Sequence, residues 1–144
     1  MSAPIDHKPG TVFEYNNLAS YMHSALIQKK SGEKLLDYIR PRLLDPLRIE
    51  LTEWEDSPEG INGGGWGIFL KTEDMAKIGL FLLQKGKWDN KQLLSANLVT
   101  DGCSFQVPTA PEGTDLEQLE KNDWYQGYGY HIWQSRNNAF SAYG

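Results

Sequence analysis

The spacing of apolar residues changes along the chain, and this change limits the possible folds more than any other feature. After Asn17 the apolar residues recur at intervals of three and four, which is typical of one face of an amphipathic helix. These residues are Leu18, Tyr21, Met22, Ala25 and Leu26. Further helices are expected from about Glu33 and from Thr72. The alternation within Tyr125–Trp133 predicts a strand, and Arg136-Asn137-Asn138 predicts the turn into a second strand. We therefore expect an α+β fold, mostly helical, with an antiparallel strand pair.

Glycine and proline residues mark the ends of these expected elements. Gly32 ends the first helix, whereas Pro41 and Pro46 break or kink the second because neither can donate a backbone hydrogen bond. Gly79 on the inner face of the third helix predicts close packing against another backbone. The run Gly63-Gly64-Gly65-Trp66-Gly67 lacks the Lys-Ser/Thr of a phosphate-binding loop, so we interpret it as a tight turn beside its tryptophan.

Composition excludes several classes of function. The 144 residues include 14 Lys and Arg against 19 Asp and Glu, a net charge of −5 that argues against nucleic-acid partners. No apolar run reaches the length of a membrane span. The single cysteine, Cys103, cannot form an internal disulfide, and the carboxylate of nearby Asp101 disfavours a thiolate nucleophile. The composition fits one compact, acidic domain.

Few residues have the spacing of a reactive or binding site. His7, His23 and His131 have no other ligand residues at a metal-binding spacing. Tyr15-Asn16-Asn17 brings a phenol and a carboxamide close together at the start of a helix, although Asn17 could instead be the helix N-cap. The aromatic run from Trp124 to Trp133 could stack on sugars or bases, or could simply pack along a strand.

A resemblance to a known family rests on several short motifs in order. It begins with His7-Lys8-Pro9-Gly10-Thr11-Val12-Phe13-Glu14-Tyr15-Asn16-Asn17 and continues through Gly64-Gly65-Trp66-Gly67 and Thr72-Glu73-Asp74-Met75-Ala76-Lys77-Ile78-Gly79. It ends with Gly86-Lys87-Trp88 and Gly127-Tyr128-Gly129-Tyr130, and it is thinnest between Ser95 and Asn122. In this order the motifs resemble the class C β-lactamase-like serine hydrolases, relatives of penicillin-binding proteins, D,D-peptidases and esterases.

The resemblance implies a β-lactamase-like (transpeptidase-like) fold with a Ser-x-x-Lys nucleophile motif, a middle Tyr-x-Asn motif and a strand-borne third motif. Only the middle motif matches convincingly, since Ser31-Gly32-Glu33-Lys34 follows Tyr15, whereas the family's nucleophile precedes this motif. Residues 1–144 are therefore expected to be a single partial domain from inside such an enzyme. By this resemblance Tyr15 is the base-side catalytic residue and Asn17 orients the substrate and the lysine. No metal or organic cofactor is implied, and an extracytoplasmic location is favoured.

The activity implied for the parent enzyme is hydrolysis of an ester or amide, such as a β-lactam or a D-Ala peptide, through an acyl-serine. The chain alone is expected to be inactive. One alternative is a non-catalytic module that binds carbohydrate or peptidoglycan on the aromatic strand. Another is a fragment that functions only when docked on the missing segments. Exposed strand edges also predict self-association.

Overall fold

The computed structural model describes residues 7–51 and 53–143, so residues 1–6, Thr52 and Gly144 lie outside the described residues. The chain forms two compact units. The first contains residues 7–15 and 100–143, and the second contains residues 16–99. Each is described separately below.

The second unit begins with α1, Asn17–Ser31. The Asn16 side chain accepts a hydrogen bond of 2.8 Å from the Leu18 N–H and caps the helix. Gly32 ends it in the left-handed conformation, with φ of 79°, and its N–H donates to the Gln28 carbonyl. The helix expected after Asn17 and its end at Gly32 are thus confirmed.

The buried face of α1 differs from the prediction. Tyr21 is buried as expected, and Ser24 is buried beside it, but Leu18, Met22 and Leu26 are 44%, 51% and 49% exposed. The physical reason is that α1 packs through Tyr21, which stacks on Trp66, and through Ser24, which the Gly64 backbone approaches closely. Its more strongly apolar stripe is left uncovered within this unit. Apolar periodicity located the helix and misassigned its inner face.

The core of the second unit surrounds a broken helix. Helix α2, Leu35–Ile39, passes into a π-helical turn, η1, Arg40–Leu44. Pro41 lies in the first turn of η1, where the change in helical type is expected because proline donates no hydrogen bond. Residues from these elements, the following connector and α3 form one hydrophobic cluster, namely Leu36, Leu44, Leu47, Ile49, Leu51 and Phe81.

Helix α3, Thr72–Leu83, contributes Phe81, which is 2% exposed. The expectation of close backbone packing at Gly79 is wrong, because a Cβ built there meets nothing within 4 Å. A two-residue hairpin follows, in which β1, Lys87–Trp88, pairs antiparallel with β2, Lys91–Gln92. Helix α4, Ala96–Gly102, then spans the boundary between the units.

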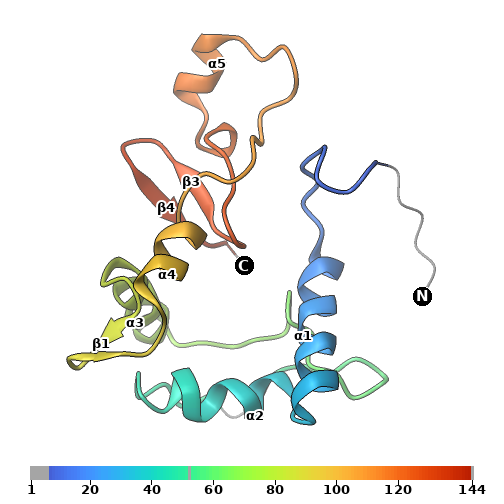
Figure 1. Cartoon of the computed structure of the whole chain (residues 1–144), viewed down its shortest axis with the longest axis vertical. Helices are drawn as coiled ribbons and strands as arrows, with labels where there is room; N and C mark the ends of the chain where they lie inside the picture. The colour runs from blue at the N-terminus through green and yellow to red at the C-terminus, as the bar shows by residue number, and fades with distance from the viewer. Residues whose placement is uncertain (1–6, 52, 144) are drawn as a thin grey trace. The chain divides into compact units, whose positions relative to one another are not determined.

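The first unit contains the second strand pair. Helix α5, Leu116–Lys121, is followed by a 3₁₀ turn, η2, Asp123–Tyr125. Strand β3, Trp133–Ser135, pairs antiparallel with β4, Ala139–Ser141, and Figure 1 shows this hairpin in orange and red. Asn137 and Asn138 both have positive φ, as the primed turns of tight hairpins require. The α+β fold with an antiparallel strand pair is confirmed.

The prediction of a strand over Tyr125–Trp133 is wrong, because the regular strand begins only at Trp133. Positive φ values of 112° at Gly127 and 60° at His131 interrupt the extended backbone. Tyr128 forms only isolated bridges, with Val107 and with Trp133. The alternation therefore comes from an irregular segment folded back on itself.

None of the helices in the described ranges has the length and apolar character needed to cross a membrane.

Candidate active site

Tyr15 lies on the surface of the first unit and packs against other aromatic rings. Its ring stacks on Trp133, with centroids 5.8 Å apart and an interplanar angle of 27°. It also contacts Tyr128 edge-on, with centroids 6.4 Å apart. The residue is 53% exposed, so these contacts hold one side of the ring while much of the side chain is open to solvent.

Trp133 is the centre of this aromatic cluster. Besides Tyr15 it contacts Trp124 at 4.8 Å, Tyr128 at 4.9 Å and Phe13 at 5.7 Å, mostly edge-on. Offset and edge-on geometries are those that aromatic pairs prefer. The sequence signalled the aromatic run but gave no sign of this central role, because the contacts with Phe13 and Tyr15 join residues more than a hundred positions apart.

Burial changes the pKa of one phenol and of the thiol in this unit. Burial, and to a lesser degree the neighbouring Tyr15, raise the pKa of Tyr128 and keep this phenol protonated. Burial also raises the pKa of the Cys103 thiol. A raised pKa opposes formation of the thiolate, which agrees with the expectation that Cys103 is not a nucleophile.

Asn17 is the first residue of α1 and belongs to the second unit. It is exposed, and the capping hydrogen bond to the Leu18 N–H comes from the side chain of Asn16. The alternative in which Asn17 caps the helix is therefore wrong. The two consecutive asparagines indicated that either residue could be the N-cap of this helix.

The Ser31–Lys34 pair is engaged in other contacts. The Ser31 hydroxyl donates to the Ile27 carbonyl at 2.8 Å, and the Lys34 ammonium forms an ion pair with Asp56. In a Ser-x-x-Lys site the ammonium would serve the serine hydroxyl. These contacts agree with the expectation that the spacing of this pair is a coincidence.

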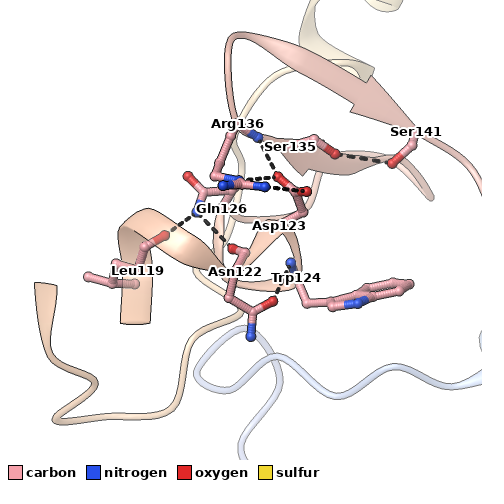
Figure 2. A network of polar contacts seen from close by, with 8 residues as sticks. All are labelled: Leu119, Asn122, Asp123, Trp124, Gln126, Ser135, Arg136 and Ser141. Carbon is pink, nitrogen blue, oxygen red and sulfur yellow. Dashed lines mark hydrogen bonds and ion pairs between the residues drawn. The ribbon is translucent and has the colours of Figure 1, made fainter. Parts of the chain in front are cut away.

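A polar network beside the aromatic cluster ties η2 to the hairpin (Figure 2). The Asp123 carboxylate accepts from the Arg136 Nε at 2.8 Å and from its backbone N–H at 3.0 Å. Asn122 accepts a hydrogen bond from the Trp124 N–H at 3.0 Å. The network fixes the backbone around Trp124, one of the rings that contacts Trp133. Within residues 7–51 and 53–143, no three metal-ligating side chains of the His, Cys, Asp or Glu type form a group.

The comparisons with known proteins decide the family. The Beta-lactamase family model matches residues 1–144, which is the whole sequence. This chain belongs to the Beta-lactamase family. Its predicted resemblance to β-lactamase-like serine hydrolases is thereby confirmed. The comparison with curated proteins returned no match.

A solved structure has the fold of this Beta-lactamase family member. It is a Bacillus anthracis protein described as a proposed 6-aminohexanoate-dimer hydrolase, 23% identical in sequence, with a TM-score of 0.71. The similarity covers 99% of this chain and 34% of that one. The chain thus spans about a third of the length of the structure that it matches.

Proposed function

We propose that residues 1–144 are a single partial domain, the part of a serine hydrolase that carries the Tyr-x-Asn motif. The whole enzyme would cleave an ester or amide, such as a β-lactam or a D-Ala peptide, through an acyl-serine. The observation that carries the proposal is the family match over residues 1–144 together with Tyr15 and Asn17 at the start of α1. The nucleophilic serine would come from another part of the enzyme, and this chain alone would be inactive.

Tyr15 is proposed to act on the base side of the reaction. A serine that attacks an acyl carbon must lose its proton, and a phenolate can accept that proton when a nearby cation stabilises it. The ring contact with Trp133 would hold the phenol in place, and its exposure would leave the hydroxyl accessible. Burial raises the pKa of Tyr128, which opposes formation of a phenolate at that residue.

Asn17 is proposed to orient the substrate amide and the catalytic lysine. A carboxamide carries both a donor and an acceptor, so one side chain can accept from the ammonium and donate to a substrate carbonyl. The use of Asn16 as the cap supports this role, because the carboxamide of Asn17 does not have to satisfy the helix terminus.

The test measures binding and hydrolysis with the chain itself. Benzylpenicillin, a β-lactam amide, is titrated against tryptophan fluorescence for the wild type and for Asn17→Ala. Loss of one hydrogen bond is expected to weaken binding by about two- to tenfold. Asn97→Ala, at an exposed position of α4, is the matched control and should bind as the wild type does.

Three outcomes would contradict the proposal. Equal affinity of Asn17→Ala and the wild type, or no binding by either, would overturn the assignment of Asn17. The proposal of a partial, inactive enzyme would be overturned if the chain steadily hydrolysed a chromogenic β-lactam or a p-nitrophenyl ester and Tyr15→Phe abolished this hydrolysis. Tyr143→Phe controls for loss of a hydroxyl elsewhere in the aromatic cluster.

A second candidate function is non-catalytic binding of carbohydrate or peptidoglycan on the aromatic cluster. It is favoured by Trp124 and Tyr143, which are 48% and 56% exposed with ring centroids 4.6 Å apart. Flat exposed rings of this kind stack on apolar faces of ligands. Saturable changes in tryptophan fluorescence with peptidoglycan fragments, lost in Trp124→Ala, would support this function, and no change would contradict it.

A further inference from the structure

The glycine run of the second unit packs directly on the first turns of α1. A Cβ added to Gly65 would lie 3.0 Å from the Asn17 carbonyl oxygen, 3.0 Å from the Ser20 Cβ and 3.4 Å from the Asn17 Cβ. At Gly64 the added atom would lie 2.6 Å from the Ser20 carbonyl oxygen. The two backbones are thus closer than any residue with a side chain would allow without movement.

We infer that Gly65 is a positioning residue for Asn17, so that the glycine run fixes the place of the motif carboxamide. The inference rests on the proposed function for the importance of Asn17, but the contact itself lies wholly within the second unit. Asn17 is the first residue of its helix, where hydrogen bonding leaves the backbone less restrained than in the middle. The neighbouring glycine backbone supplies restraint from outside the helix.

The loop can restrain α1 because it is itself held at several points. Trp66, next to Gly65, stacks on Tyr21 of α1 with centroids 5.7 Å apart and an interplanar angle of 23°. The indole of Trp54 donates to the Trp66 carbonyl at 2.7 Å. The Gly63 N–H donates to the Glu55 carbonyl at 2.8 Å. These contacts make the loop a fixed support rather than a chain that yields when α1 moves.

The Tyr21 side chain joins the same support from the helix side. Its hydroxyl donates to the Ser57 hydroxyl at 3.0 Å, and the residue is 6% exposed. The first turns of α1 therefore contact the loop through Asn17, Ser20 and Tyr21. A methyl group at Gly65 would displace Asn17, while the contacts of Tyr21 keep the rest of the helix in place.

The experiment compares Gly65→Ala with Gly79→Ala in the full chain. Gly79 lies inside α3, and apart from its chain neighbours and the nearby backbone of this helix no atom lies within 4 Å of an added Cβ. Its alanine variant should therefore be stabilised without any effect on Asn17. In ¹H–¹⁵N spectra, Gly65→Ala is expected to shift the side-chain amide signals of Asn17 and to leave those of Asn97 in place. Benzylpenicillin binding should weaken about two- to fivefold through this displacement.

A double variant separates positioning from a general loss of stability. If Gly65 acts through Asn17, adding Gly65→Ala to Asn17→Ala should weaken binding no further than Asn17→Ala alone. Additive losses, or unchanged Asn17 amide signals in Gly65→Ala, would overturn the inference. If Asn17→Ala binds as the wild type while Gly65→Ala shifts the Asn17 amide, the proposed function fails and the positioning contact stands.

Discussion

At the scale of single residues, Asp123 shows how one exposed carboxylate organises a turn. Its oxygens accept from the Nε and Nη2 of Arg136 at 2.8 Å and 3.2 Å and from the Arg136 backbone N–H (Figure 2). The side-chain and backbone hydrogen bonds from Arg136 lower the pKa of Asp123. Both partners are open to solvent, so screening limits the energy of this pair.

The lowered pKa predicts a pH dependence of stability. A carboxyl with a lower pKa in the folded chain stabilises it above the unfolded pKa, near about 4, and loses that contribution as pH falls through the folded value. The urea midpoint of the wild type should therefore fall more steeply below about pH 4 than that of Asp123→Asn. Circular dichroism during urea titration measures this. Parallel curves for the wild type and Asp123→Asn would refute the expectation.

At the scale of elements, a loop residue completes the start of a helix that lacks its own cap. Lys34, at the N-cap of α2, makes no side-chain capping bond. Instead the carboxamide oxygen of Asn62 accepts from the Leu36 N–H at 2.9 Å, and its nitrogen donates to Asp56 at 2.7 Å. Asn62 is 2% exposed, so the carboxamide is a buried link between the glycine-containing loop and α2.

Removal of this link should destabilise the second unit. Asn62→Ala leaves the Leu36 N–H buried without a partner, and we expect a loss of about 2 kcal/mol in the free energy of unfolding. Chemical denaturation of the full chain measures the change. The control Asn97→Ala alters an exposed helical position and should change the free energy little. A loss in Asn62→Ala no larger than in the control would show that α2 does not depend on this bond.

At the scale of the whole molecule, apolar surface and a strand edge are left open. Leu18, Met22 and Leu26 form an exposed stripe on α1. Among the described residues, β4 pairs with β3 alone and has a free outer edge. Unpaired edges and contiguous apolar patches favour association between chains.

We therefore expect the chain to self-associate, as its sequence also indicated. The average mass from light scattering should rise across a concentration series, and the double variant Leu18→Gln/Leu26→Gln should reduce that rise. Leu116→Gln removes a leucine of 77% exposure from α5 and should have less effect, because it lies outside the stripe. A constant monomer mass for the wild type would contradict the expectation.

The candidate motif and the helix that follows it could be predicted from the sequence. The bounds of α1, the turn at Asn137 and Asn138 and the Tyr15–Asn17 motif are set by residues close together in the chain. Capping side chains, positive φ and short motifs act within a few positions, so their signals remain legible without a structure. The roles of Tyr15 and Asn17 in catalysis remain a prediction.

Only the tertiary structure decided which of these local features meet. Apolar spacing could not say that α1 buries Tyr21 and Ser24, since that depends on where the glycine run packs. The central place of Trp133 and the contact of Gly65 with Asn17 likewise join segments far apart in sequence. Such contacts depend on packing across the fold, and a single sequence carries no local signal for them.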